Sequence, residues 1–266
     1  MSGGAGYAAA DSLVVSNCSF VHNGRTFSNA LAAYDSEGGG LDAIVKSTAR
    51  VIKSVFRQNA GKSGAGMSIL GSYWTYFWIT NSTFEGNIAS GAGAAVHVTD
   101  VQLTISNSQF VANQASSKGG AIFGEPYGQS TVTIKDSSFV NNTAQAGGAL
   151  DVGPTNTFII SKSKFISNMA DDNGGAISKE DGGLTLNDCE FTNNQADSSG
   201  GALYSNDGSG SLVSVSKCAF FENFASENGG GVAANYESRH SFVDCLFSGN
   251  FASGFGGATW VNKRSI

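Results

Sequence analysis

Pairs of apolar residues separated by a single residue, which is polar in most copies, recur along the chain at a fixed distance before a phenylalanine. In five successive copies they lie seven and five positions before it. Alternation with a period of two is typical of a β-strand with one buried face, and no stretch shows a sustained helical period. The pairs are Leu103 and Ile105, Val132 and Ile134, Phe158 and Ile160, Leu184 and Leu186, and Val213 and Val215.

The phenylalanine after each pair begins the motif F-x-x-N, which occurs nine times at intervals of 26 to 36 residues. Most copies are followed eight or nine residues later by a glycine-rich tetrad, such as "GGAI" at Gly119 or "GGAL" at Gly147. Self-similarity at such a period is the signature of a solenoid. Because each period holds short strands and glycine turns, we expect an all-β, single-stranded parallel β-helix of about nine coils, stacked about 4.8 Å apart.

Equivalent residues of successive coils should stack in columns. The Asn of F-x-x-N is present in every copy, and stacked amides can hydrogen-bond in a ladder. Asn also tolerates the left-handed backbone conformation, so we expect it to form the tight corners of the coil. The expected structural ladder comprises Asn23, Asn59, Asn87, Asn113, Asn142, Asn168, Asn194, Asn223 and Asn250.

The repeated F-x-x-N and G-G-A-[ILV] motifs resemble those of the polymorphic membrane proteins (Pmp) of chlamydiae, over essentially the whole chain. The resemblance implies a right-handed, pectin-lyase-like β-helix. It also implies an exported, cell-surface protein of the outer membrane or a secreted one, in which the β-helix is the exposed part of an autotransporter and acts in adhesion. These implications concern fold and location more directly than they concern any one ligand.

The chain also differs from that pattern. Its first residues, "MSGGAGYAAA", lack the basic region and apolar run of a secretory signal. The terminal coils show no polar cap of the kind that solenoids use. We therefore expect one soluble β-helix domain over residues 1–266 that is a segment of a longer protein or has ends covered by partners. The first interval is the longest, which predicts an extra loop near residues 24–32.

Composition narrows the function classes. The chain has 36 glycines and two prolines, and its formal net charge is −6. Binding to nucleic acid needs clustered Lys and Arg, so a nucleic-acid partner is not expected. No stretch is long and apolar enough to predict a transmembrane segment. The sequence predicts no cofactor and no metal site, because it lacks the calcium-binding nonapeptide repeat and metal-type cysteine spacing.

The aromatic run "YWTYFW" at residues 73–78 is the main departure from the repeat. Aligned on Phe84, Phe77 and Ile79 take the inward positions of their strand. Alternation then directs every second residue before them outward. The residues expected on the surface are Trp74, Tyr76 and Trp78.

Two cations are expected beside these aromatic side chains. Lys46 and Arg50 lie in the equivalent strand one coil earlier, and Arg50 is placed to stack on Trp78. Exposed aromatic patches commonly mark interaction sites. We therefore propose this group as a binding site for a protein partner or for a host or cell-surface ligand such as a glycan. The alternative is that the loop near residues 24–32 folds over the patch and makes it part of the core.

Signs of catalysis are weak in the sequence. A β-helix enzyme would need carboxylates converging on one face, but Asp171 and Asp172 form the only adjacent Asp pair and lie in a predicted turn. The three histidines occupy different repeat positions, and no catalytic residue is predicted. Three cysteines follow one another in a column of small residues, which favours buried thiols but leaves a disulfide or redox role open. They are Cys189, Cys218 and Cys245.

Together these observations predict a non-enzymatic surface or scaffold β-helix that mediates adhesion or protein–protein interaction. One alternative is a structural subunit of a larger assembly, docked through uncapped ends. Another is a carbohydrate-binding or carbohydrate-active β-helix protein. Such an enzyme would need a cleft with converging carboxylates that the sequence does not reveal.

Overall fold

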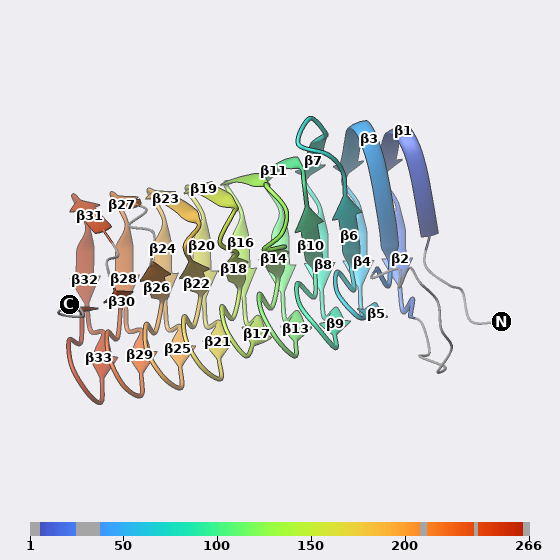
Figure 1. Ribbon diagram of the computed structural model, residues 1–266. Helices are drawn as coiled ribbons and strands as arrows, with labels where there is room; N and C mark the ends of the chain where they lie inside the picture. Colours follow the sequence, from blue (N-terminus) through green and yellow to red (C-terminus); the bar gives the residue numbers. More distant parts are fainter. Residues whose placement is uncertain (1–5, 25–37, 208–211, 237–238, 263–266) are drawn as a thin grey trace.

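The computed structural model describes residues 6–24, 38–207, 212–236 and 239–262, and within these ranges all regular structure is β-strand. The strands are short, parallel to their neighbours in adjacent coils, and stacked along one axis (Figure 1). A complete coil in the middle of the stack contributes one strand to each of four rows. The prediction of an all-β parallel solenoid of about nine coils is therefore confirmed.

The tetrad row follows the glycine tetrads. Its strands are β6 (Met67–Leu70), β10 (Val96–Thr99), β14 (Ile122–Gly124), β18 (Leu150–Val152), β22 (Ile177–Glu180), β26 (Leu203–Asp207), β30 (Val232–Tyr236) and β34 (Thr259–Val261).

The alternating row holds the strands that the apolar alternation predicts. They are β7 (Tyr76–Thr80), β11 (Gln102–Ser106), β15 (Thr131–Lys135), β19 (Thr157–Ser161), β23 (Gly183–Asn187), β27 (Leu212–Ser216) and β31 (Arg239–Val243). Two long strands, β1 (Gly6–Ser16) and β3 (Leu41–Ile52), precede both rows. Because β3 pairs with both β6 and β7, the two rows form one sheet of 17 strands.

The remaining two rows close the coil. The Phe row has nine strands: β2 (Ser19–Val21), β4 (Val55–Arg57), β8 (Thr83–Glu85), β12 (Gln109–Val111), β16 (Ser138–Val140), β20 (Lys164–Ile166), β24 (Glu190–Thr192), β28 (Ala219–Phe221) and β32 (Leu246–Ser248). The short row has eight: β5 (Ala60–Gly61), β9 (Ile88–Ala89), β13 (Gln114–Ala115), β17 (Thr143–Ala144), β21 (Met169–Ala170), β25 (Gln195–Ala196), β29 (Phe224–Ala225) and β33 (Phe251–Ala252).

The phenylalanines of the nine motifs stack ring on ring through the interior. Neighbouring ring centroids lie 4.6–5.0 Å apart and the rings are within 6° of parallel. Seven of the nine rings are fully buried, and the alternating-row pairs pack against them in a single core. This column fixes the register of every coil, since a one-residue slip would turn the rings outward.

The Asn residues of the motif form a continuous hydrogen-bonded column beside the rings. In each case the side-chain amide donates to the Oδ1 of the next Asn at 2.8–3.0 Å. In the middle of the stack the same nitrogen of Asn142 also donates to the carbonyl of Phe110. The backbone N–H of Asn142 donates to the Oδ1 of Asn168. Each amide therefore satisfies backbone groups of the corner as well as its neighbour in the column.

The corner prediction for these Asn residues was wrong in one respect. The left-handed residue is the one before each Asn, because the Asn itself turns its side chain inward to bond the adjacent coils. A second left-handed corner lies three residues before each Phe, and it is occupied at several coils by charged residues such as Lys162 and Asp188. Residues 24–32, where an extra loop was expected, lie largely outside the described residues.

Candidate functional site

The aromatic run lies at the start of β7, on the outer face of the alternating row. Phe77 and Ile79 are fully buried, and β7 pairs in register with β3 and β11, so the predicted strand alternation holds from Tyr76 onward. Trp74 is 73% exposed and Tyr76 is 47% exposed. Phe77 therefore belongs to the core, Trp74 and Tyr76 lie on the surface, and Trp78 is half-buried.

Trp74 reaches the surface through a turn rather than through the strand. The backbone N–H of Thr75 donates to the carbonyl of Ser72 at 2.7 Å, and the buried Thr75 hydroxyl donates to the carbonyl of Val45 at 3.0 Å. This turn, which the two hydrogen bonds hold in place and which we call the pinned turn, protrudes above the stack between β6 and β7 (Figure 1). It also presents a second aromatic ring, Tyr73, whose centroid lies 5.2 Å from that of Trp74 in an edge-to-face arrangement.

The other two aromatic side chains form a stacked pair with a cation. The rings of Tyr76 and Trp78 lie 6.1 Å apart with an 18° angle between them. The guanidinium carbon of Arg50 lies 5.1 Å from the centroid of Trp78, a cation–π distance. Within the described part of the chain no ion pair of Arg50 is found. We call Tyr73, Trp74, Tyr76, Trp78 and Arg50 the aromatic patch.

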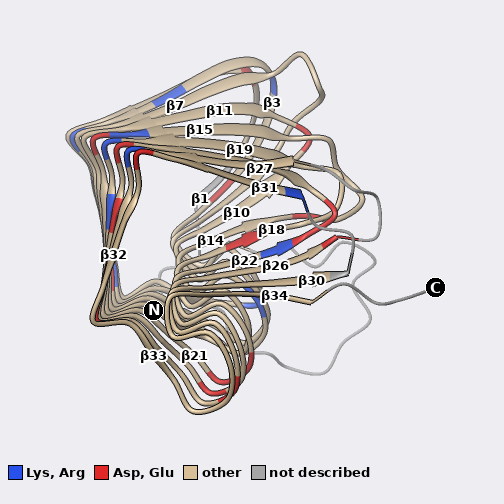
Figure 2. Ribbon diagram, turned by 90° about the vertical axis from the view of Figure 1, so that its left-hand side faces the viewer, with Lys and Arg blue, Asp and Glu red and all other residues tan. Residues whose placement is uncertain are grey.

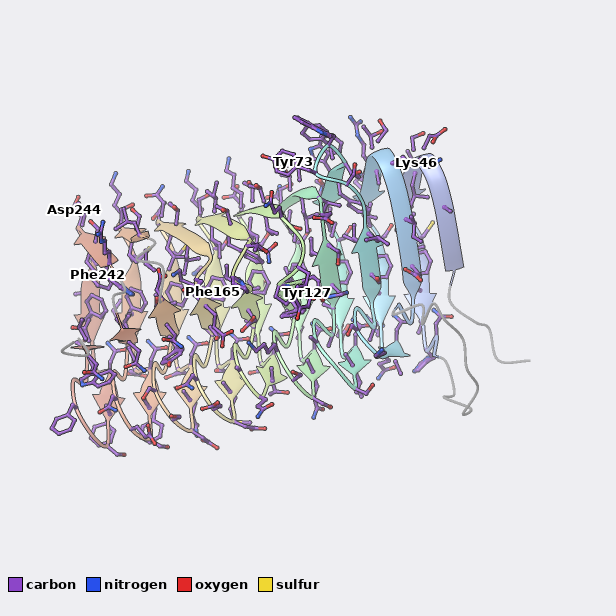
Figure 3. All side chains as sticks on the ribbon, in the orientation of Figure 1. Lys46, Tyr73, Tyr127, Phe165, Phe242 and Asp244 are labelled. Carbon is purple, nitrogen blue, oxygen red and sulfur yellow. The ribbon has the colours of Figure 1, made fainter. Side chains whose placement is uncertain are left out.

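Lys46 does not join the aromatic patch by contact. Its ammonium lies 3.7 Å from the carboxylate of Asp11, and both side chains are almost fully exposed. Lys46 and Tyr73 nevertheless project from the same side of the stack (Figure 3). Surface ion pairs of this kind are weak, so Lys46 can still contribute a positive charge to the rim of the patch.

A second group of polar side chains, which the sequence analysis missed, lies on the tetrad row. The ammonium of Lys118 bonds the carboxylate of Glu180 at 2.9 Å, and these two residues come from coils on either side of Asp151. Asp151 is buried, and neither of its carboxylate oxygens has a hydrogen-bond partner. One coil earlier, His97 bonds Glu125 at 3.0 Å and stacks on Phe123.

Burial dominates the electrostatics of Asp151. It raises the pKa of this carboxyl to about 7, although the charge of Lys118 opposes the shift. The attraction of Asp151 and Glu180 outweighs burial for Lys118 and raises the pKa of its ammonium. The sequence feature that could have revealed this group is the position of Asp151, directly after the inward-facing Leu150 of a glycine tetrad. A pair of adjacent acidic residues was not the right feature to look for. Asp171 and Asp172, the pair considered in the sequence, are exposed in a turn.

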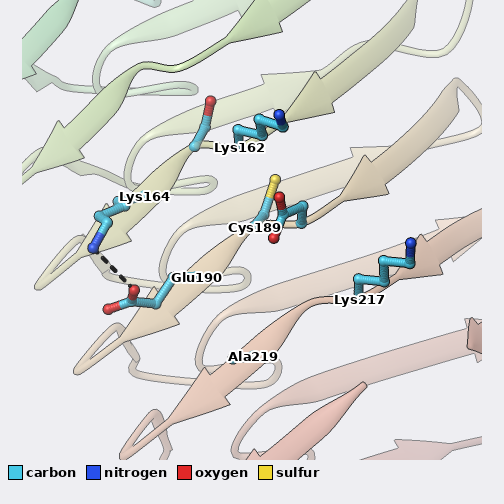
Figure 4. Close-up of a pocket in the computed structure, with 8 residues that line it drawn as sticks. Lys162, Lys164, Cys189, Glu190, Lys217 and Ala219 are labelled. Atoms are coloured by element: carbon cyan, nitrogen blue, oxygen red, sulfur yellow. Dashed lines mark ion pairs between the residues drawn. The ribbon is translucent and has the colours of Figure 1, made fainter. Parts of the chain in front are cut away.

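The cysteine column lies beside a shallow hollow at the corner between the alternating and Phe rows. The hollow has a volume of about 370 Å³ and includes Lys162, Cys189, Glu190 and Lys217 in its lining (Figure 4). All four cysteines are free thiols. The pKa of the Cys218 thiol is raised by its hydrogen bond with Cys189 and by burial. The same hydrogen bond lowers the pKa of the Cys189 thiol, and both thiols are buried in the column of small residues.

Charged side chains gather along that same corner in alternating sign. The left-handed corner position carries Asp136, Lys162, Asp188, Lys217 and Asp244 in successive coils (Figure 2). The described residues contain no group of three or more potential metal-binding side chains. They also contain no helix that is long and apolar enough to cross a membrane.

Comparison with known families agrees with this architecture. The sequence model described as "Right handed beta helix region" matches residues 3–191. The model of the Chlamydia polymorphic membrane protein repeat matches residues 188–206 and 244–262. A search of curated proteins returned no match. The chain belongs to the right-handed β-helix family, and two segments near its C-terminal end match the repeat of the chlamydial polymorphic membrane proteins.

Proposed function

We propose that residues 1–266 form one β-helix domain of an adhesin-like surface protein, exported in its natural context, and that it binds a protein partner through the aromatic patch. The Pmp-type repeats support a surface protein. The observation that carries the proposal is the exposure of Trp74 and Tyr76 on a pinned turn and a regular strand. The coils on either side have Thr48 and Gln102 at the position of Tyr76, so the patch is a local addition to the repeat.

The test is adhesion of the purified protein to cultured cells. The double variant Trp74→Ala and Tyr76→Ala should lose at least about tenfold in apparent affinity, because exposed aromatic anchors dominate binding energy at interfaces. The matched control is Thr131→Ala with Thr133→Ala, on the same face two coils away. Equal binding by the wild type and the aromatic double variant would exclude the patch as the binding site.

A glycan is the second candidate ligand, and the stacked pair of Tyr76 and Trp78 favours it. Two nearly parallel rings offer a flat platform to a sugar ring, and the N–H groups of Arg50 match a carboxylate. Treating the cells with glycosidases separates the two candidates. Binding that survives this treatment and is lost after mild proteolysis of the cells supports the protein partner.

A carbohydrate-active function is supported by one observation, the grouping of Asp151, Glu180 and Lys118. Carboxyl groups in different environments are what acid–base catalysis on a sugar requires. Against it, the ammonium of Lys118 and the carboxylate of Glu180 already bond each other across the coil of Asp151. The absence of activity stays a prediction. Turnover of a polyuronate that is abolished by Asp151→Asn would overturn it.

A further inference from the structure

A lysine and an aspartate meet in the interior of the β-helix. Lys179 on β22 and Asp207 on β26 belong to adjacent coils, and both side chains are 0% exposed. The Nζ of Lys179 lies 2.7 Å from the Oδ2 of Asp207. Lys179 takes an inward column position that Val152 holds in the preceding coil. The ion pair is therefore shielded from solvent, and Lys179 fills a position that an apolar side chain holds one coil earlier.

An ion pair in such a place is costly, since desolvation of the two charges can exceed their mutual attraction. Transfer of a proton from the ammonium to the carboxylate removes both charges. It also creates a neutral amine in contact with a carboxylic acid. Two groups held in contact react with effective concentrations far above those in solution. The geometry thus places a nucleophile against an electrophile without intervening solvent.

We propose that Lys179 and Asp207 become joined by an intramolecular amide bond that covalently links two adjacent coils. The proton passes from Nζ to Oδ2 along their hydrogen bond, and the Nζ lone pair then attacks Cγ. Nitrogen then carries two protons; one of them leaves with the departing hydroxyl as water, and the other stays as the N–H of the amide. One N–C bond forms, one C–O bond breaks, and no oxidant or reductant is needed.

We assign the transfer of that proton to His240, on which the charges of Lys179 and Asp207 both act. It lies on β31 of the facing row, in register with the fully buried Val213, and neither of its ring nitrogens has a hydrogen-bond partner. Burial and the charge of Lys179 lower its pKa to about 4, with Asp207 opposing, so the imidazole is neutral. A neutral imidazole has one N–H donor and one acceptor, which together can move a proton from nitrogen to the departing hydroxyl.

The first experiment is the mass of the full chain under denaturing conditions. The amide makes it lighter than the sequence predicts by the mass of one water molecule. Trypsin should then fail to cleave after Lys179 and should release residues 165–217 as one peptide that is one water lighter and linked internally between Lys179 and Asp207. A chain of full sequence mass, cleaved normally after Lys179, would overturn the proposal.

One variant makes the result specific. Lys179→Arg cannot form the amide and should restore the full mass. Glycine follows Asp207 in the sequence, and an Asp–Gly step can lose water by forming a succinimide. If the mass deficit of one water persists in Lys179→Arg, it comes from the succinimide, and the amide proposal is refuted. Should this variant fail to fold, fragmentation of the wild-type peptide still locates the bond.

The molecule contains its own control for the role of burial. Lys118 and Glu180 lie at a similar distance, 2.9 Å, but are partly exposed and remain hydrated ions. No cross-link should form between them, and Lys118→Arg should leave the mass deficit unchanged.

The role of His240 as proton carrier has its own test. The protein is made by cell-free synthesis and its mass is measured at successive times. In His240→Leu the mass deficit should appear more slowly than in the wild type. An unchanged rate would remove His240 from the mechanism.

Discussion

Asp151 occupies a position at which the neighbouring coils have Phe123 and Ser178, and its buried carboxyl group has no hydrogen-bond partner. Its pKa is raised to about 7 in the folded protein, against an ordinary value near 4 in the unfolded chain. Between these values the folded state binds more protons than the unfolded state. Stability therefore falls as the pH rises from about 4 to about 7, and the loss is complete above pH 7.

Asp151→Asn should remove this pH dependence. The free energy of unfolding of the variant relative to wild type should increase between pH 4.5 and pH 8 by at most about 4 kcal/mol, from a shift of about three pKa units. Chemical denaturation at the two pH values measures it. Asp172→Asn, an exposed carboxyl in a turn, is the control and should give a difference near zero. A difference for Asp151→Asn that does not change with pH would contradict the raised pKa.

Single-residue roles were only partly accessible from the sequence. Strand alternation placed Phe77 inward and Tyr76 outward, because a period of two leaves no other choice once one position is fixed. The turn that carries Trp74 was not predicted, since it depends on the Thr75 hydroxyl reaching Val45 thirty residues away. The burial of Asp151 and Lys179 was also missed, because side chains from neighbouring coils enclose them and a single sequence does not show that enclosure.

At the scale of the coil, the glycine tetrad performs two different tasks. The first glycine, Gly147 in the central coil, has a left-handed backbone with a φ of +61°. The second, Gly148, has ordinary backbone angles but lies against the carbonyl oxygens of Gly175 and Met169, where a Cβ would collide with both. The strands and the glycine turns were predictable from the repeat, because every coil repeats the same local chemistry.

Gly148→Ala should therefore be strongly destabilising, because backbone atoms of the next coil cannot move aside without breaking the stack. We expect a loss of about 3 kcal/mol or more in the free energy of unfolding, in the range for overpacking a rigid site. The comparison is Gly86→Ala, at a corner with a φ of +61° where the nearest atom to a new Cβ is a flexible Gln58 side chain at 3.4 Å. It should cost only about 1 kcal/mol, the usual penalty for a left-handed non-glycine residue. Equal losses in the two variants would mean that backbone angle, rather than close approach, explains the tetrad.

The whole molecule is a quasi-one-dimensional stack, in which each coil contacts mainly its neighbours. Stability in such a structure is the sum of coil terms and nearest-neighbour interfaces. The Phe and Asn columns run through every interface, so damage at one coil should spread to adjacent coils and fade with distance. The ion pairs, by contrast, do not continue from coil to coil. On the Phe row, for example, Arg57 pairs with Glu85 and Lys164 pairs with Glu190.

Phe139→Ala tests this view of the stack. The Phe139 ring is fully buried between those of Phe110 and Phe165, and its removal should cost about 3–5 kcal/mol. Amide hydrogen exchange should show faster opening of β12, β16 and β20, with β4 and β28 close to wild type. Phe251→Ala, whose ring is 58% exposed, should change exchange only near its own strand. Uniform acceleration in Phe139→Ala, from β4 to β28, would instead mean that the solenoid unfolds as one cooperative unit, with no nearest-neighbour decay along its axis.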